Sequence, residues 1–264
     1  WQRRRDFDIV HSHGAYYTHA FIGPLSRAAG LKSLVKASLA NDDLLDLNLP
    51  LIGYLHRMML RRIDAYVGIS EDLVQEFRAG SLDPRKIHHI PNGVDTGLFQ
   101  PCPRDRRMAL RERLGLPAGQ PVALYVGVLD QRKNIEWLAE QWVRHQAFGT
   151  NGLLLAVGPQ SREDADGALR GRLAALGESH PGLFVLRDFS TDILAYYQSA
   201  DALVLPSLKE GLPNVVLEAM ACGLPCVAAR ASGSRELIRE GETGYTYAHG
   251  DVTEMGEALR RCLS

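Results

Sequence analysis

Residues 121–158, "PVALYVGVLDQRKNIEWLAEQWVRHQAFGTNGLLLAVG", hold the pattern that decides the fold. The apolar run at 121–129 predicts a strand, the helical period of 133–146 predicts a helix, and the apolar run at 152–158 predicts a second strand. A strand, a helix and a strand in this order form a βα unit. Runs of Val, Leu and Ala that alternate with helices are typical of a parallel sheet buried on both faces.

The same alternation extends in both directions along the chain. Towards the C-terminus it predicts strands at 182–189, 201–207 and 225–229, and helices at 162–178, 191–200 and 252–263. Towards the N-terminus it predicts strands at 6–14, 33–39, 65–70 and 86–93, and helices near 17–30, 50–63 and 71–79. Pro, Gly and Asn cluster at 91–105, where the periodicity lapses. We therefore expect two α/β domains, residues 1–98 and residues 99–264.

The composition excludes several classes of protein. The chain has 264 residues, 45% of them hydrophobic, with a net charge of −1, so it can bury a core and has no charge that would attract nucleic acid. Its four cysteines form no CxxC pair, which favours a reducing compartment and a cytoplasmic protein. No apolar run approaches the roughly 20 residues of a membrane span. The expected partner is a small molecule.

The segment "PSLKEGLPNVVLEAMACGLPCVAA", residues 206–229, carries the clearest chemistry. Pro213 suits the first turn of a helix, and Gly223 with Pro225 ends that helix. A helix that starts directly after a strand and a glycine-bearing loop leaves unpaired N–H groups at its tip, and the helix dipole adds positive charge there. We therefore predict an anion site at the N–H groups of Asn214, Val215 and Val216.

Two carboxylates flank this predicted anion site. Glu218 lies one turn into the helix and its side chain leans back towards the tip, where it can accept hydrogen bonds from a ribose diol. Glu210, on the preceding loop, can reach hydroxyl groups on the other side of a phosphate. The pattern predicts a nucleotide-sugar site, with ribose at Glu218 and sugar at Glu210. Two solvated carboxylates, or a glycosidase pair, are the alternatives, and neither explains the anion site.

The residues from Glu210 to Pro213, followed by Glu218-Ala219-Met220-Ala221, resemble the Glu-seven-Glu signature of retaining GT-B glycosyltransferases, the family-four or group 1 enzymes. The likeness extends to "ISEDLVQEF", "IPNGVDTGLFQP", "YVGVLDQRKNIEWL", "DALVLPSLKEG" and "SGSRELIREGETGY", which follow the family's order. The resemblance implies an α/β GT-B fold of two Rossmann-like domains, with the acceptor-side domain at 1–98 incomplete and a nucleotide-sugar domain at 99–264. It also implies truncation at both ends.

The resemblance further implies the donor-binding residues. In this family a Gly-Arg pair and a following Lys bind the donor diphosphate; here Gly127 and Lys133 keep the spacing, but Val128 replaces the Arg. Arg132 is a substitute for the missing guanidinium, or a solvated side chain. Glu210 and Lys133 are the implied catalytic residues. The other implied donor contacts are Gly127, Arg132, Gly211, Leu212, Pro213, Asn214, Val215 and Glu218.

The acceptor side of the predicted site is less complete. His13 and Gly14 end an early strand and are the candidates, with a packed imidazole as the alternative for His13. The histidine that the family usually places near Ser38 and Asn41 is absent. The "DFD" at residues 6–8 matches the metal-binding Asp-x-Asp of GT-A enzymes only superficially, and the alternate histidines 11 and 13 have no third ligand nearby. We expect no metal and no cofactor beyond the nucleotide-sugar co-substrate.

The expected reaction moves a hexose from a nucleotide diphosphate sugar to an acceptor hydroxyl, with retention of the α-configuration. The acceptor class stays open between a sugar, a lipid-linked molecule and another small molecule. A GT-B epimerase or phosphorylase is one alternative. A non-catalytic nucleotide-sugar-binding fragment is another, favoured by Val128 and by the absent histidine. Residues 186–190, "LRDFS", are the segment expected to contact the base.

Residues 47–63, "LNLPLIGYLHRMMLRRI", predict an amphipathic helix with Arg residues beside its apolar face. Such a helix covers the first sheet or lies on an anionic membrane. Peripheral contact at the inner membrane face therefore remains open for an otherwise cytoplasmic protein. The apolar positions are Leu51, Leu55, Met58 and Met59, and the cationic neighbours are His56, Arg57, Arg61 and Arg62.

Overall fold

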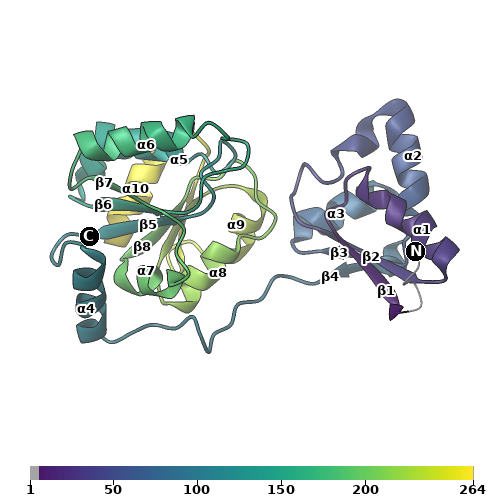
Figure 1. The fold of residues 1–264 in the computed structure, drawn as a ribbon, viewed down its shortest axis with the longest axis horizontal. Helices are drawn as coiled ribbons and strands as arrows, with labels where there is room; N and C mark the ends of the chain where they lie inside the picture. The colour runs from purple at the N-terminus through teal and green to yellow at the C-terminus, as the bar shows by residue number, and fades with distance from the viewer. Residues whose placement is uncertain (1–5, 264) are drawn as a thin grey trace. The chain divides into compact units, whose positions relative to one another are not determined.

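The computed structural model describes residues 6–263, which form two compact units (Figure 1). The first unit extends to Asn92 and also contains Lys209–Leu212, while the second contains Gly93–Leu208 and the chain from Pro213 onwards. The first crossing between the units falls at Asn92, inside the Pro- and Gly-rich segment. The short loop Lys209–Leu212 packs with the first unit although its sequence neighbours belong to the second.

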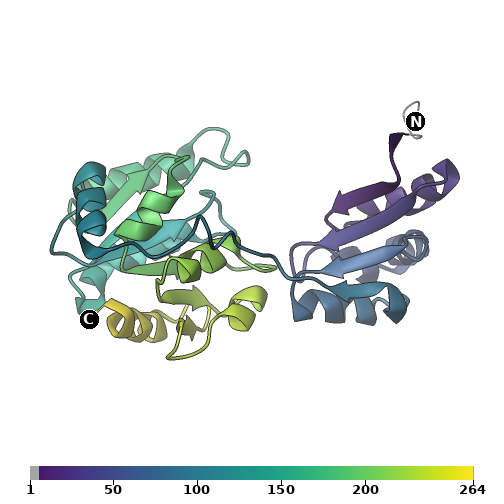
Figure 2. The same ribbon diagram turned by 90° about the horizontal axis from the view of Figure 1, so that it is seen from below.

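The first unit is built on a parallel sheet of four strands, in the order β1–β2–β3–β4 within the described residues (Figure 2). The strands are β1 (Ile9–His13), β2 (Lys32–Ala37), β3 (Ala65–Gly68) and β4 (Ile87–His89). The helical elements are η2 (His19–Phe21), α1 (Ile22–Ala29), η3 (Leu45–Asn48), α2 (Pro50–Leu60), α3 (Glu71–Ala79) and η4 (Pro84–Lys86). Ser70 caps α3 by accepting the Leu73 N–H, and acidic residues fill the first turn.

The second unit is built on a six-stranded parallel sheet in the order β10–β9–β8–β5–β6–β7. This is the doubly wound order in which the strand sequence reverses direction between β5 and β8. The strands are β5 (Val122–Val126), β6 (Leu153–Val157), β7 (Phe184–Arg187), β8 (Ala202–Leu205), β9 (Cys226–Ala229) and β10 (Gly244–Tyr247). Strands β5, β6, β8 and β9 are almost fully buried, as a sheet covered on both faces requires.

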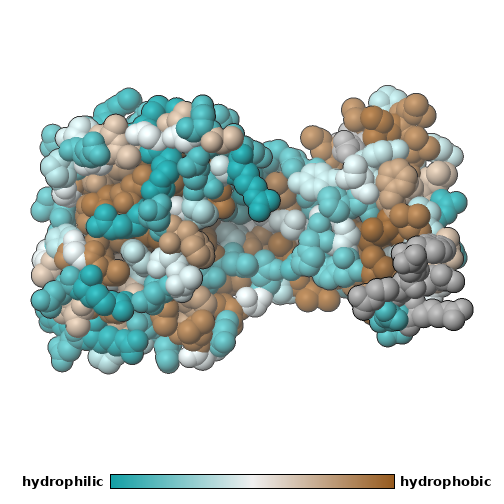
Figure 3. Space-filling model, viewed as in Figure 1, coloured by the Kyte–Doolittle hydropathy of each residue, from teal (hydrophilic) through white to brown (hydrophobic). Residues whose placement is uncertain are grey.

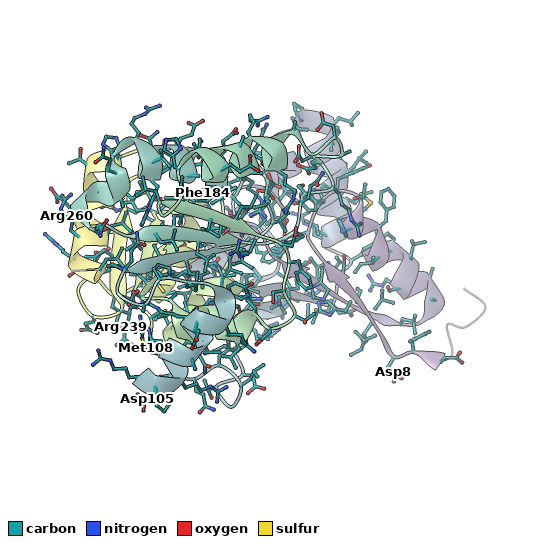
Figure 4. The ribbon with its side chains drawn as sticks, turned by 60° about the vertical axis from the view of Figure 1, so that its left-hand side comes forward. Asp8, Asp105, Met108, Phe184, Arg239 and Arg260 are labelled. Atoms are coloured by element: carbon teal, nitrogen blue, oxygen red, sulfur yellow. The ribbon has the colours of Figure 1, made fainter. Side chains whose placement is uncertain are left out.

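Helices cover both faces of this second sheet. One apolar cluster packs α5 (Ile135–Arg144), α6 (Ala168–Ser179) and α10 (Val252–Leu263) on one face, where Phe184 of β7 lies with the leucines of α6 (Figure 4). The other cluster packs α7 (Ile193–Ser199) and α8 (Asn214–Ala221) on the opposite face. The unit also contains α4 (Arg104–Leu114), η5 (Gln146–Gly149) and α9 (Ser232–Leu237). The α/β fold with two parallel sheets is therefore confirmed.

Two α-helices and one strand were not predicted from the sequence: α4, α9 and β10. Helix α6 was predicted, but it begins at Ala168 rather than near residue 162. Gly167 adopts a left-handed φ of 71°, and the Asp164 carboxylate accepts the backbone N–H groups of Leu169 and Arg170. Because Asp164 satisfies these first N–H groups from outside the helix, the segment before Gly167 is a loop.

Candidate functional site

The candidate donor site lies at the carboxyl edge of the second sheet, where β5 and β8 are neighbours. The loops that follow these two strands meet, because the Leu208 N–H donates to the Arg132 carbonyl oxygen at 2.9 Å. In open α/β sheets, ligands bind at this switch point because the helices that follow the two strands, here α5 and α8, lie on opposite faces of the sheet. The residues predicted to bind a diphosphate lie on the first of these loops and at the start of α8, which follows the second.

The loop after β5 is fixed by backbone contact at Gly127. The Gly127 N–H donates to the Val157 carbonyl oxygen at 3.1 Å, which extends the strand pairing, and the Tyr125 hydroxyl donates to the Val128 carbonyl oxygen at 2.9 Å. An ideal Cβ on Gly158 would lie only 1.8 Å from the Gly127 carbonyl oxygen. Two glycine backbones therefore meet here, and no side chain fits between them.

Asp130 organises the two cations of the same loop. The Lys133 N–H donates to the Asp130 carboxylate at 2.6 Å, and the Arg132 guanidinium lies 3.8 Å from the other carboxylate oxygen. Asn134 then takes a left-handed φ of 56° and precedes α5. Part of the Arg132 charge is compensated by Asp130, which weakens the case for Arg132 as the substitute guanidinium. Val128 itself is 37% exposed.

The tip of α8 differs in two details from the expectation. Pro213 is the residue before the helix, with ψ of 114°, rather than part of its first turn, so α8 begins at Asn214. The Val216 N–H is not open, because it donates to the Pro213 carbonyl oxygen at 3.1 Å. The N–H groups of Asn214 and Val215 have no hydrogen-bond partner among residues 6–263. Two open donors remain at the tip, rather than three.

Glu218 is half-buried on α8 and is held by Tyr197. The Tyr197 hydroxyl donates to the Glu218 carboxylate at 2.7 Å, and the fully buried Tyr197 ring packs edge-on against Phe99. Burial raises the pKa of the Glu218 carboxyl above its ordinary value, although the Tyr197 hydrogen bond acts in the opposite direction. Tyr197 uses one acceptor position of a carboxylate that has about four. The others can receive hydroxyl groups of a ligand.

Glu210 lies in the loop that packs with the first unit and is only 6% exposed. Next to it, an ideal Cβ on Gly211 would lie 2.0 Å from the Ser38 carbonyl oxygen, so only glycine permits this approach. Glu210 and Glu218 therefore belong to different packing units, and their joint action on one ligand stays a prediction.

Side chains of the first unit hold this loop from both ends. The Asn92 side-chain amide donates to the Leu212 carbonyl oxygen at 3.0 Å, and Lys36 donates to the Asn92 side-chain oxygen at 3.0 Å. At the other end, the Lys209 ammonium lies 3.1 Å from an oxygen of the Asp42 carboxylate. These contacts fix the backbone on either side of Glu210, and sequence analysis missed all of these partners.

The predicted acceptor residues lie at the carboxyl end of β1. His13 is exposed, its ring lies 4.3 Å from that of His11, and it is in register with Lys36 of β2. Burial, and then the charges of His13 and Lys36, lower the pKa of His11. Gly14 has a φ of 99° and donates its N–H to the Lys36 carbonyl oxygen at 2.8 Å, so glycine is favoured at this turn.

Residues 6–263 include side chains of the types that bind metal ions. No group of three or more His, Cys, Asp or Glu side chains in this part of the chain is arranged to hold a metal ion. The four cysteines are free thiols.

Two parallel α/β units, the second with its strand order reversing at the candidate site, define the GT-B class of fold. Residues 120–264 match the family described as Glycosyl transferases group 1, and residues 1–98 match Glycosyltransferase Family 4. The chain therefore belongs to the group 1 glycosyltransferases.

Curated relatives include D-inositol 3-phosphate glycosyltransferases. The protein from Acidothermus cellulolyticus is 30% identical over 97% of this chain and 60% of its own length. The protein from Mycobacterium bovis is 30% identical over 97% of this chain and 54% of its own length. The chain thus spans little more than half the length of these relatives.

Solved structures share the fold. Anabaena HepE in complex with UDP-glucose superposes with a TM-score of 0.81 at 21% identity, over 100% of this chain and 71% of that chain. Sucrose-phosphate synthase from Thermosynechococcus elongatus superposes with a TM-score of 0.79 at 24% identity, over 97% of this chain and 64% of that chain.

Proposed function

We propose that this chain forms the donor-binding part of a retaining hexosyltransferase. The single observation that carries the proposal is the arrangement of groups at the carboxyl edge of the second sheet. There the two open N–H groups at the tip of α8 and the half-buried Glu218 lie on the helix that follows the second of two loops, and these loops meet at the strand reversal. Open donors at a helix tip favour a phosphate, and a carboxylate one turn later favours a ribose diol. The complexes of HepE with UDP and UDP-glucose support a nucleotide-sugar donor.

In the proposed reaction, the nucleotide diphosphate leaves the sugar and an acceptor hydroxyl takes its place on the same face. The leaving phosphate accepts the acceptor proton, so no side-chain nucleophile is required. Lys133 and the N–H groups of Asn214 and Val215 stabilise the charge that develops on the diphosphate. Glu210 orients the sugar and Glu218 holds the ribose. His13 and Gly14 contact the acceptor.

Donor binding can be tested directly with the 264-residue chain. A thermal-shift panel of UDP, GDP and ADP, each with and without its glucose or mannose, should give a selective rise in melting temperature for one base, because a ligand that binds only the folded state stabilises it. The shift should be unchanged by a chelator, since the proposal needs no metal. A panel in which no nucleotide raises the melting temperature would contradict the proposal.

Transfer needs a separate assay. Incubation with the selected donor and a set of sugar, lipid-linked and polyol acceptors should yield an α-linked product by NMR from an α-linked donor. An inverted product would exclude retention. Saturable nucleotide binding with no transfer or hydrolysis would favour the second candidate, a nucleotide-sugar-binding protein without catalysis. Val128 favours that second candidate, because a guanidinium at its position would contribute charge to the diphosphate site.

The proposed location of the protein is the cytoplasm, on the basis of its cysteines. All four cysteines are free, which fits a reducing, cytoplasmic environment. Among residues 6–263, no helix is both long enough and apolar enough to span a bilayer.

A further inference from the structure

Helix α2 (Pro50–Leu60) presents an apolar face to solvent. His56, Met59 and Leu60 are buried beneath it, while Leu51 and Tyr54 are 71% and 63% exposed. The exposed face continues to Met58, so it follows the spacing of one helix face, three and then four residues apart. Figure 3 shows hydrophobic residues gathered over α2. The helix is therefore apolar on its outer side as well as on its inner side.

The exposed surface extends into the turn before α2. We call the whole surface the α2 patch; its members are Leu45, Leu49, Leu51, Ile52, Tyr54 and Met58, each at least 38% exposed. Single exposed leucines are common on soluble proteins and need no explanation. Several large apolar side chains on one short segment are uncommon and mark a surface that contacts something else.

The charges at the C-terminal end of the α2 patch have one sign, whereas Asp46 follows Leu45 in the sequence at its other end. From Leu47 to Ile63 the sequence contains no Asp or Glu, but it contains Arg57, Arg61 and Arg62. Arg61 and Arg62 are exposed at the C-terminal end of the helix, and Arg62 donates to the Met58 carbonyl oxygen at 3.0 Å. The next carboxylate in sequence, Asp64, pairs with Lys32 at 3.2 Å. The α2 patch therefore has a cationic border at that end.

We propose that the α2 patch binds the surface of an anionic lipid bilayer. Apolar side chains on one helix face can enter the boundary between headgroups and acyl chains, while arginines beside them contact anionic headgroups. The combination of apolar area with a cationic border at the C-terminal end of α2 favours this occupant, because an apolar protein partner would not need such a border. A short helix that cannot span a bilayer fits this peripheral arrangement.

The proposal does not depend on the proposed glycosyl transfer. No candidate donor-binding residue lies on α2, so nucleotide binding and membrane binding can be measured and lost separately. A variant of the α2 patch that loses vesicle binding should keep the nucleotide-induced thermal shift of the parent chain.

Vesicle co-sedimentation tests the proposal with the intact 264-residue chain. Vesicles of phosphatidylcholine with about one-third phosphatidylglycerol should bind the chain, pure phosphatidylcholine should bind it much less, and high salt should weaken binding. The double variant Leu51→Gln/Tyr54→Gln removes apolar surface with a residue that forms helices well, so it should retain the fold and lose most binding.

The charge contribution has its own variants. Each arginine near an anionic surface contributes about 1 kcal/mol, which is about a fivefold change in partition coefficient. Arg61→Gln/Arg62→Gln should therefore weaken binding to anionic vesicles by roughly 25-fold by this rule and leave the weak binding to neutral vesicles unchanged. The matched controls are Leu98→Gln, at a leucine 52% exposed outside the patch, and Arg239→Gln, at an exposed arginine of the second unit (Figure 4).

Three outcomes would overturn the proposal. The first is no binding to anionic vesicles by the folded parent chain, with circular dichroism used to verify the fold. The second is equal loss of binding in the patch and control variants. The third is concentration-dependent self-association that the Leu51→Gln/Tyr54→Gln variant abolishes while vesicle binding is absent, which would assign the α2 patch to a second copy of the chain.

Discussion

Replacing Glu218 by Gln separates the stability of the fold from ligand binding. Glu218 is half-buried, and burial raises the pKa of its carboxyl. A buried charge costs free energy that a neutral amide of the same shape does not. The Gln side-chain oxygen can still accept the Tyr197 hydroxyl, which lies 2.7 Å from the carboxylate. At pH 7 the Glu218→Gln variant should therefore be at least as stable as the parent chain.

Nucleotide affinity, unlike stability, should fall in the Glu218→Gln variant. A hydrogen bond to a charged acceptor contributes about 1.5–3 kcal/mol, and an amide offers one oxygen where the carboxylate offers two. If Glu218 holds the ribose diol, Glu218→Gln should weaken nucleotide binding by roughly tenfold to a hundredfold. Loss of affinity without loss of stability is the result expected for a residue that binds ligand rather than supporting the fold.

The pH dependence follows from the direction of the shift. Because the folded-state pKa of Glu218 lies above its ordinary value of 4.5, the folded protein binds this proton more tightly than the unfolded chain does. The carboxylate's cost to stability is present above the folded pKa, and it is relieved as the pH falls through that pKa towards 4.5. Nucleotide affinity should fall over the same window, since a protonated carboxyl accepts fewer hydrogen bonds. Neither effect of Glu218 should remain in Glu218→Gln.

Isothermal calorimetry with the nucleotide selected by thermal shift measures the affinity, and urea denaturation between pH 5 and 8 measures the stability. Glu178→Gln, at an exposed glutamate of α6, is the matched control and should change neither. Unchanged affinity in Glu218→Gln would refute the assignment of the ribose. A loss of stability at pH 7 greater than about 1 kcal/mol would refute the argument from burial.

Three further substitutions test other parts of the second unit. Gly158→Ala places a Cβ 1.8 Å from the Gly127 carbonyl oxygen, so it should destabilise the fold by about 1–3 kcal/mol in urea denaturation, whereas Gly119→Ala, with open space around its Cβ, should not; equal stabilities would show that the glycine contact relaxes freely. Gln146 has a left-handed φ of 43°, so Gln146→Gly should raise the free energy of unfolding by about 0.5–1 kcal/mol, and a decrease would contradict strain at this turn. Lys133→Gln should weaken binding of a nucleoside diphosphate in calorimetry but not that of the nucleoside, and an equal loss for both would exclude phosphate contact by Lys133.

The sequence predicts the strands best where their residues are continuously apolar. Helix α4 shows why some other elements were not predicted. Its sequence, "RDRRMALRERL", has few apolar residues, so a search for apolar period finds nothing. The helix is anchored instead by Arg111, which is 5% exposed and donates to the Ser199 carbonyl oxygen at 2.9 Å and to the Asp201 carboxylate. A buried arginine paired across the fold leaves no local sequence signal.

Some residues of the candidate site could likewise be predicted from the sequence, and others could not. The helix tip and Glu218 could be predicted because a Gly-Leu-Pro turn before an apolar helix is a local pattern. Tyr197 and Asn92 could not, because their partners are distant: Tyr197 reaches Glu218 across 21 residues, and Asn92 reaches Leu212 across 120 residues. Only the folded chain brings these pairs together. The prediction of an open N–H group at Val216 was wrong. The Pro213 carbonyl oxygen accepts this N–H, which a helix start usually leaves open.

Glu210 and Glu218, the two carboxylates of the proposed site, are held in place by different units of the chain. The contact of Gly211 with Ser38 and the hydrogen bond from Asn92 to Leu212 tie this loop to the first unit, while Glu218 is held by Tyr197 of the second. The proposed ribose contact therefore depends on packing inside the second unit alone. The proposed sugar contact depends on the first unit as well, because Ser38 and Asn92 of that unit contact the backbone that follows Glu210. If Glu218 binds the ribose and Glu210 the sugar, as proposed, a substitution that disturbs one contact should leave the other in place.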